Sequence, residues 1–430
     1  MKIKSRLLAA TLSVVAAVPL FAVTGCKKAA DLRIYNCYDY IDEALIAKFT
    51  KEYKAKTGKK IKVEYSCFDT PEDCYNALKI DGTAYDLVCP SDYMIEKMAR
   101  EDMLEEITLS EDGGYMKNVS PFIRNKFEEI SFGGKSLANY AAGYMWGTLG
   151  LVYDVNGKTV TADDMKSWSV LWNDSLKNKF TIKDSVRDTY FIGLAKYYKN
   201  DLENAKSAYA GGGTLADYQT ALKSKFNDTA ESTVSGVEKI LKDLKARSKG
   251  MEVDSGKDDI LKGDIDVYFA WSGDAVYAMD EGAGNSVKKY LDYVVPEEGS
   301  NVWFDGWCVP KGAKNKELAL EFIDFISAPE NAIANMEYIG YVSCIAGSDV
   351  YSWVKETYAV ADGGNVKAEA ETVDLSYFFG AGDYGVTSNV RQFFAQYPKK
   401  EIVDRCVVMN YYPDEANSRI NNMWSRIKTA

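Results

Sequence analysis

The chain has 430 residues, of which 47% are hydrophobic, and it carries a formal net charge of -11. This length favours two domains with sizeable cores, and the acidic balance disfavours nucleic acid and anionic ligands while it favours cations. Histidine is absent from the sequence, which excludes Ser-His-Asp and Cys-His catalysis and zinc sites with histidine ligands.

The N-terminus has the pattern of an export signal. Basic residues precede the apolar run Leu7–Val23, and the tetrapeptide that follows, Val23-Thr24-Gly25-Cys26, resembles a bacterial lipobox. The pattern predicts that residues 1–25 are removed and that the thiol of Cys26 receives lipid, which anchors a periplasmic or cell-surface lipoprotein. An ordinary signal peptide and a retained anchor are the alternatives. The remaining cysteines have no CxxC spacing, so neither a metal site nor a redox motif is expected.

The first part of the mature chain alternates strands and helices. Hydrophobic periodicity predicts strands over Leu32–Asn36, Ile61–Tyr65 and Tyr85–Cys89, with helices over Asp42–Thr57 and Pro71–Lys79 between them. This order builds parallel βα units, whose ligands bind beyond the carboxyl ends of the strands. The loops expected at the ligand are therefore Cys37–Tyr40, Cys67–Pro71 and Pro90–Tyr93.

The middle of the chain predicts a second unit of the same kind. The glycine-punctuated apolar strand Gly143–Tyr153 is expected to cross into it. Further strands are predicted over Phe180–Ile182 and Ile265–Ala270, and the polar segment Asn200–Thr233 is interpreted as a surface insertion. Helices are predicted later at Val237–Arg247, Ala275–Glu281, Asn315–Ser327, Asn331–Ile339 and Glu415–Lys428.

Trp303 and Asp305 stand out in the predicted strand Asn301–Pro310, which follows a short strand at Tyr293–Val295. Side chains two residues apart on a strand point to the same face. An indole and a carboxylate offered side by side suit an organic cation, because the ring face attracts positive charge and the carboxylate pairs with it. The alternative is that Trp303 belongs to the core and Asp305 caps a turn.

Several motifs in a fixed order resemble the extracytoplasmic spermidine/putrescine-binding proteins of ABC importers. They are RIYNCYDYI, AYDLVCPSDYMIEKM, SWSVLW, DSVRD, DVYFAWSGDA, VVPEEGSNVWFDGWCVPKGAKNKELALEFIDF and EYIGYVS. The resemblance implies an α/β, two-lobe periplasmic-binding-protein fold of type II, with hinge strands between the lobes. The corresponding boundaries place residues 26–143 and 304–349 in lobe 1 and residues 144–303 and 350–430 in lobe 2.

Carried over motif by motif, the resemblance also implies a set of ligand contacts. The carboxylates are expected to bind the ammonium ends of a polyamine, and the aromatic rings to cover its methylenes. The sequence departs from the family at two positions. Cys37 stands where the family usually has Trp, which removes one stacking wall that Tyr38 is expected to replace. Ser185 stands where spermidine-type members can have Asp, and together with Asp39 and Asp274 it favours a diamine. The implied contacts are Tyr38, Asp39, Tyr40, Ser91, Tyr93, Ser185, Asp188, Trp271, Asp274, Trp303, Asp305 and Tyr341.

The expected function is therefore that of a monomeric, lipid-anchored solute-binding protein. It would capture putrescine or spermidine and deliver it to ABC permease subunits, with no catalytic residue, no cofactor and no nucleic-acid partner. One alternative is another ligand, such as a sugar, an amino acid or ferric ion, for which the pair Tyr411-Tyr412 is suited. A polyamine sensor without transport and a cell-surface hydrolase with paired carboxylates are the others.

Overall fold

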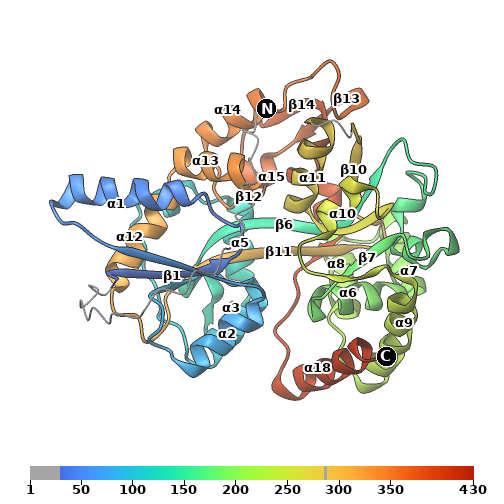
Figure 1. The fold of residues 1–430 in the computed structure, drawn as a ribbon, viewed down its shortest axis with the longest axis horizontal. Helices are drawn as coiled ribbons and strands as arrows, with labels where there is room; N and C mark the ends of the chain where they lie inside the picture. The colour runs from blue at the N-terminus through green and yellow to red at the C-terminus, as the bar shows by residue number, and fades with distance from the viewer. Residues whose placement is uncertain (1–29, 285–287) are drawn as a thin grey trace, which may run out of the picture.

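The protein consists of two α/β lobes that lie side by side and are joined by two long strands. The computed structural model describes residues 30–284 and 288–430, so the predicted signal sequence and Cys26 lie outside the described residues. Figure 1 shows β6 (Ala141–Asp154) and β11 (Ser300–Cys308) running from one lobe into the other. Within the described ranges, no helix has the length and apolarity that crossing a membrane requires.

A single sheet continues through both lobes. Its other strands are β1 (Leu32–Cys37), β2 (Val63–Phe68), β3 (Leu87–Val88), β7 (Phe180–Lys183), β8 (Gly250–Glu252), β9 (Val267–Trp271), β10 (Leu291–Val294), β12 (Val342–Ser343) and β15 (Cys406–Val407). The main path runs β2-β1-β3-β11-β6-β9-β7-β8. The N-terminal part of β6 pairs with β11, and its C-terminal part pairs with β9 and β10. Strand β6 therefore belongs to the sheets of both lobes.

The first lobe has the parallel βα order that the sequence predicts. Its helices are α1 (Glu43–Thr57), α2 (Pro71–Ile80), α3 (Asp92–Arg100), α4 (Gly114–Asn118), α5 (Pro121–Glu129), α12 (Lys316–Ile326), α13 (Pro329–Ile339) and α14 (Ser348–Thr357). Thr70 and Asp73 form a capping box at the start of α2, which satisfies backbone N–H groups that the helix cannot pair. The side chain of Asp42 caps α1 by accepting from the backbone N–H of Ala44. These caps fix where α1 and α2 begin, and so fix the loops that lead out of β1 and β2.

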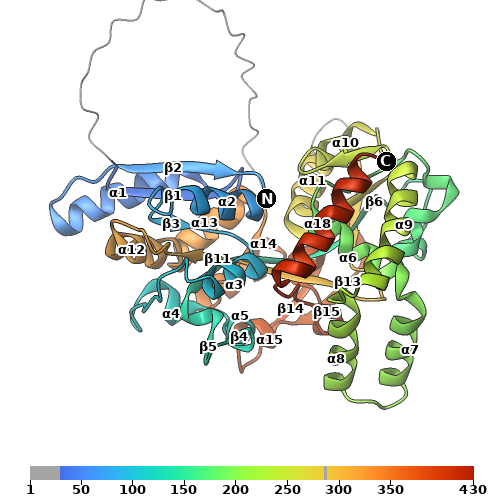
Figure 2. The same cartoon turned by 90° about the horizontal axis from the view of Figure 1, so that it is seen from below.

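The second lobe is built on β7, β8 and β9, which are parallel to one another. Its helices are α6 (Val186–Tyr197), α7 (Lys199–Ala210), α8 (Leu215–Phe226), α9 (Glu231–Arg247), α10 (Gly256–Lys262), α11 (Ser272–Gly284) and α18 (Asp414–Lys428). The predicted insertion over 200–233 contains α7 and α8, a helical hairpin that projects from the lobe in Figure 2. Short 3-10 helices occupy Asp164–Lys166, Trp168–Trp172 and Asp174–Leu176.

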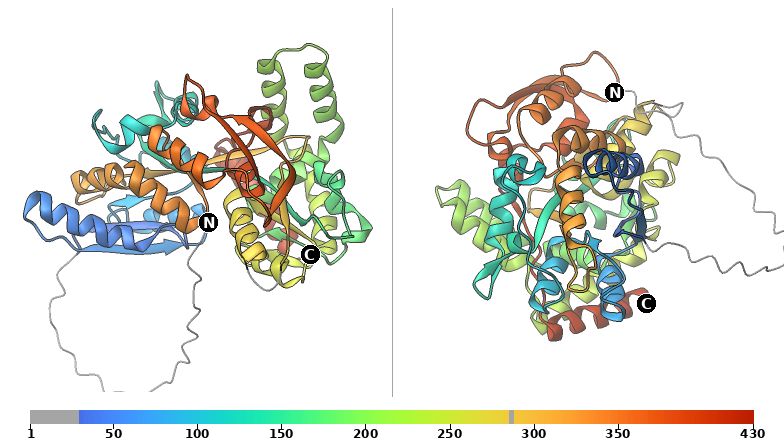
Figure 3. Two further views of the ribbon diagram at one scale, coloured as in Figure 1. Left: turned by 90° about the horizontal axis from the view of Figure 1, so that it is seen from above. Right: turned by 90° about the vertical axis from the view of Figure 1, so that its left-hand side faces the viewer.

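The segment after α14 adds a two-stranded sheet and three short helices. They are β13 (Val366–Asp374), α15 (Ser376–Phe379), β14 (Gly385–Val390), α16 (Arg391–Gln396) and α17 (Lys400–Val403). In Figure 3 the β13–β14 hairpin lies over the junction of the lobes. The side chains of Val373 and Phe378 pack into the hydrophobic cluster that contains the strands of the first lobe, whereas the predicted division placed all of 350–430 in the second lobe. The lobe boundaries stay a prediction.

Candidate ligand-binding site between the lobes

Strand β11 carries the centre of the site. Its pairing with β6 is irregular between Phe304 and Gly306, and the backbone of Asp305 forms an isolated bridge with Ser91 of the first lobe instead. An irregularity of this kind re-aims a side chain relative to its neighbours. The carboxylate of Asp305 accepts a hydrogen bond of 2.5 Å from the hydroxyl of Tyr40. The loops after β1 and β3 therefore both reach Asp305.

Asp305 is a buried carboxylate next to a second one. Its side chain is 7% exposed, and burial raises its pKa to about 6, an effect that hydrogen bonds from Tyr40 and Ser91 oppose and the charge of Asp188 reinforces. Burial also raises the pKa of Asp188, which is 8% exposed. In the part of the chain that the structure describes, the lysine pairs of this region go to Glu252 and Asp274 and not to these two carboxylates. Lys183 and Arg187 lie close enough to oppose the effect of burial on the pKa of Asp188, but neither carboxylate has an ion-pair partner among the described residues. A ligand ammonium can therefore pair with them.

Three aromatic rings lie beside Asp305. The rings of Tyr40 and Tyr341 meet edge to face at 5.0 Å between centroids, and those of Trp303 and Tyr341 at 5.8 Å. Trp303 is 9% exposed, and its indole nitrogen is buried without a partner among the described residues. A Cβ at Gly147 of β6 would come within 2.5 Å of this indole, so glycine there lets the ring lie against the sheet.

The second lobe contributes Asp188 and Trp271. Ser185 precedes α6, and its hydroxyl accepts a hydrogen bond of 3.4 Å from the backbone N–H of Asp188. Ser185 thus caps the helix and positions Asp188. Trp271 ends β9, and its hydrogen bond to Asp188 lowers the pKa of that carboxyl against the larger effect of burial.

Tyr93 and Arg187 join the two lobes next to these carboxylates. The hydroxyl of Tyr93 donates to Glu72 at 3.1 Å, and the guanidinium carbon of Arg187 lies 4.3 Å from the centroid of the Tyr93 ring. On its other side the same carbon lies 3.6 Å from the ring centroid of Tyr412. Sequence reasoning did not select Glu72 or Arg187, although Arg187 lies inside the DSVRD motif.

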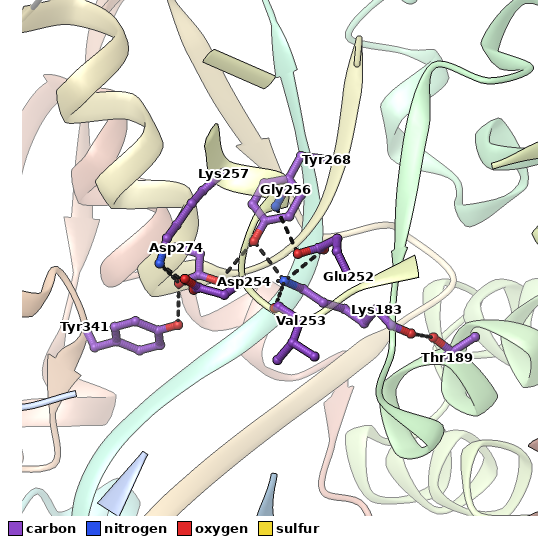
Figure 4. A network of polar contacts seen from close by, with 10 residues as sticks. All are labelled: Lys183, Thr189, Glu252, Val253, Asp254, Gly256, Lys257, Tyr268, Asp274 and Tyr341. Carbon is purple, nitrogen blue, oxygen red and sulfur yellow. Dashed lines mark hydrogen bonds and ion pairs between the residues drawn. The ribbon is translucent and has the colours of Figure 1, made fainter. Parts of the chain in front are cut away.

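Asp274 is the centre of a polar network that Figure 4 shows. Its oxygens accept hydrogen bonds from the hydroxyls of Tyr341, at 2.8 Å, and Tyr268, at 3.0 Å. The ammonium nitrogens of Lys183 and Lys257 each lie 3.8 Å from an oxygen of Asp274. Neither lysine was selected from the sequence, because no family motif covers Lys257 and the DSVRD motif begins after Lys183.

The structure thus brings together most of the residues that the resemblance implied. We call these the interlobe cluster: Tyr40, Ser91, Tyr93, Asp188, Trp271, Asp274, Trp303, Asp305 and Tyr341. Ser185 lies behind the cluster as a helix cap. Tyr38 is 64% exposed, and Asp39 is exposed with a φ of 50°; the structure joins neither of them to the cluster by a hydrogen bond.

The tyrosine pair considered for ferric ion is engaged elsewhere. The ring of Tyr411 lies 5.6 Å from the ammonium of Lys97 and 5.3 Å from the guanidinium carbon of Arg100. Tyr412 stacks on Arg187. In the described ranges, no group of three or more acidic or cysteine side chains is arranged to hold a metal ion.

Two α/β lobes that share strands, with acidic and aromatic side chains gathered where they meet, define a two-lobe binding protein. Residues 44–361 match the family of bacterial extracellular solute-binding proteins, and the chain belongs to that family. This match and the structural similarity described next confirm the fold expected from the sequence motifs.

Several proteins similar to this chain are named for polyamine binding. The chain is 30% identical over 313 residues to the spermidine/putrescine-binding periplasmic protein of Escherichia coli K12. The aligned region covers 72% of this chain and 76% of that protein. It is 26% identical over 379 residues to the putrescine-binding periplasmic protein PotF of the same organism, covering 85% and 92%. The structure of the spermidine/putrescine ABC transporter substrate-binding protein PotD from Streptococcus pneumoniae has a TM-score of 0.61 at 25% identity, covering 93% and 98%.

Proposed function

We propose that this protein captures a polyamine, putrescine or spermidine, between its lobes and delivers it to the permease of an ABC importer. The observation that carries the proposal is the pair Asp305 and Asp188, buried together with aromatic rings on one side. Carboxylates form charge-assisted hydrogen bonds with ammonium groups, and aromatic faces bury methylenes and attract the cation. The names of the relatives support the same ligand class.

We further propose that β6 and β11 act as the hinge between the two lobes, with the lobe boundaries that the sequence predicts. Ligand binding would then stabilise the closed arrangement, in which Tyr93 of one lobe stacks on Arg187 of the other. The proposal includes a lipid anchor at Cys26, an extracytoplasmic location, a monomeric state and no catalytic activity.

Thermal unfolding of the chain from residue 27 onward tests the proposed function. Free ligand at about 100 times Kd stabilises a folded protein by about 2.7 kcal/mol, which raises Tm by several degrees. We expect putrescine or spermidine to raise Tm in this way, and maltose, glutamate and ferric citrate to leave it unchanged. A Tm that responds to none of the polyamines contradicts the proposal.

Ligand affinity is expected to fall in mildly acidic solution. An ammonium group pairs with the ionised form of Asp305, and the pKa of this carboxyl is raised to about 6, so a proton competes with the ligand below that pH. The dissociation constant should rise about tenfold between pH 7.5 and pH 5, while the ammonium groups of the ligand stay charged throughout. Calorimetric titrations at the two pH values check this, and equal affinities would show that Asp305 does not bind the amine.

A further inference from the structure

The carboxylate of Asp274 is already paired with two lysine side chains of the protein. Tyr341 and Tyr268 each donate a hydrogen bond to it, and the ammonium groups of Lys183 and Lys257 approach its two oxygens from different sides (Figure 4). Asp274 is 4% exposed. A ligand ammonium that reached this carboxylate would have to lie close to two fixed positive charges, which is unfavourable in a buried site.

Lys257 lies where the second amine of a ligand was expected. The resemblance assigned Asp39 and Asp274 to the ligand, and both carboxylates raise the pKa of Lys257 against the effect of its burial. The ammonium also lies 2.5 Å from Asp254, whose side chain is 62% exposed. Lys257 therefore stays charged and presents its ammonium to the carboxylates from both lobes.

Lys183 is the second lysine of this network and lies between Asp274 and Glu252. Its side chain is fully buried, and its ammonium donates to the carbonyl of Val253 at 2.8 Å and to the hydroxyl of Tyr268 at 2.9 Å. It lies 3.2 Å from Glu252 and 4.3 Å from the ring centroid of Trp271. One face of the tryptophan assigned to the ligand is thus covered by a cation of the protein.

The two ends of the interlobe cluster consequently differ in charge. At one end the buried carboxylates of Asp274 and Glu252 are matched by Lys183 and Lys257. At the other end Asp305 and Asp188 lie together, and within the described residues neither has a lysine ion pair. Lys183 and Arg187 act on Asp188 from nearby and oppose the effect of burial on its pKa, but they form no ion pair with it among the described residues. The second end therefore gains more than the first from a cationic ligand group.

We propose that Lys257, together with Lys183, makes the site selective for an amine with one ammonium end and one neutral amide end, such as a mono-N-acylated diamine. The inference rests on the proposed function, because it assumes that the ligand is an alkylamine bound between the lobes. The ammonium end pairs with Asp305 and Asp188, and the neutral end lies toward the network of Asp274. Lys257 acts here as a positioning residue that sets the charge of Asp274.

The test compares two probes of similar length that differ by one charge, putrescine and N-acetylputrescine. Calorimetry measures both dissociation constants for the wild type and for Lys257→Met. We expect the wild type to bind N-acetylputrescine at least as tightly as putrescine, and Lys257→Met to shift the ratio of the two constants at least tenfold toward putrescine. Lys257→Arg keeps the charge and should keep the wild-type ratio.

The exposed Lys262 at the end of the same helix provides the matched control, and Lys262→Met should leave both constants unchanged. A wild type that prefers putrescine, or a ratio that Lys257→Met leaves unchanged, overturns the selectivity. A general loss of stability lowers both affinities and does not move their ratio. If putrescine, spermidine and N-acetylputrescine all fail to bind the wild type, the proposed function itself is wrong.

Discussion

Replacing Asp305 with Asn is expected to weaken polyamine binding severely while the protein stays folded. The substitution keeps the shape of the side chain and an oxygen that accepts from Tyr40, but it removes the negative charge that pairs with the ammonium. Loss of a charged partner in a buried pair costs about 2–5 kcal/mol, so calorimetry should show an affinity at least about thirtyfold weaker. A variant that retains the wild-type affinity would contradict the assignment of Asp305.

The same substitution should stabilise the ligand-free protein. Burial raises the pKa of Asp305 from 3.8 to about 6. Below pH 3.8 the carboxyl is protonated in both the folded and the unfolded chain, and its burial carries no charge penalty. The folded protein then loses stability as the pH rises from 3.8 through 6. At pH 7.5 the buried charge then costs on the order of 2–3 kcal/mol, which Asp305→Asn relieves. Denaturant unfolding should show this gain at pH 7.5 and a smaller one at pH 4.5. Asp163→Asn, at a side chain that is 88% exposed, is the control and should change neither stability nor binding.

Adding a methyl group at Gly273 is expected to damage both the fold and the site. A Cβ there would lie 2.3 Å from the ring of Tyr341, so Gly273→Ala must displace a ring that contacts Tyr40 and Trp303 and donates to Asp274. Overpacking of this kind costs about 1–3 kcal/mol, and we expect Tm to fall by several degrees. Polyamine affinity should fall at least about tenfold, because the aromatic side of the site moves.

Gly284 of the same helix gives the matched control for this variant. Among the described residues, a Cβ at Gly284 meets no atom within 4 Å. Alanine is also the better helix former, so Gly284→Ala should keep or slightly raise Tm and leave binding unchanged. Thermal unfolding and calorimetry of both variants separate the local clash from a general effect of substitution in α11. Equal behaviour of the two variants would show that the position of Tyr341 is not critical.

Local sequence patterns predicted the elements that carry the site. The alternation of strands and helices near the N-terminus depends on hydrophobic periodicity and on caps such as Thr70 with Asp73, which are properties of neighbouring residues. The motif around Trp303 and Asp305 identified β11 for the same reason, since its strand pattern is local. The ends of strands were less predictable: β3 covers only Leu87–Val88, and Pro90, two residues further, cannot donate to a ladder.

Contacts between distant segments could not be predicted in this way. The approach of Lys257 to Asp274 depends on how α10 packs against α11, and that of Lys183 on the end of β7. Arg187 was missed because its partner Tyr93 belongs to the other lobe. Conversely, the motif that suggested Tyr38 and Asp39 does not reveal that the turn after β1 leaves both side chains exposed.

A crystal structure of the protein with putrescine, or with N-acetylputrescine, tests the central claim most directly. The account predicts one amine nitrogen within about 3 Å of a carboxylate oxygen of Asp305 or Asp188, with the adjoining methylenes against the ring of Trp303. Density for the ligand at another surface, or between the lobes with its amine far from both carboxylates, would contradict it.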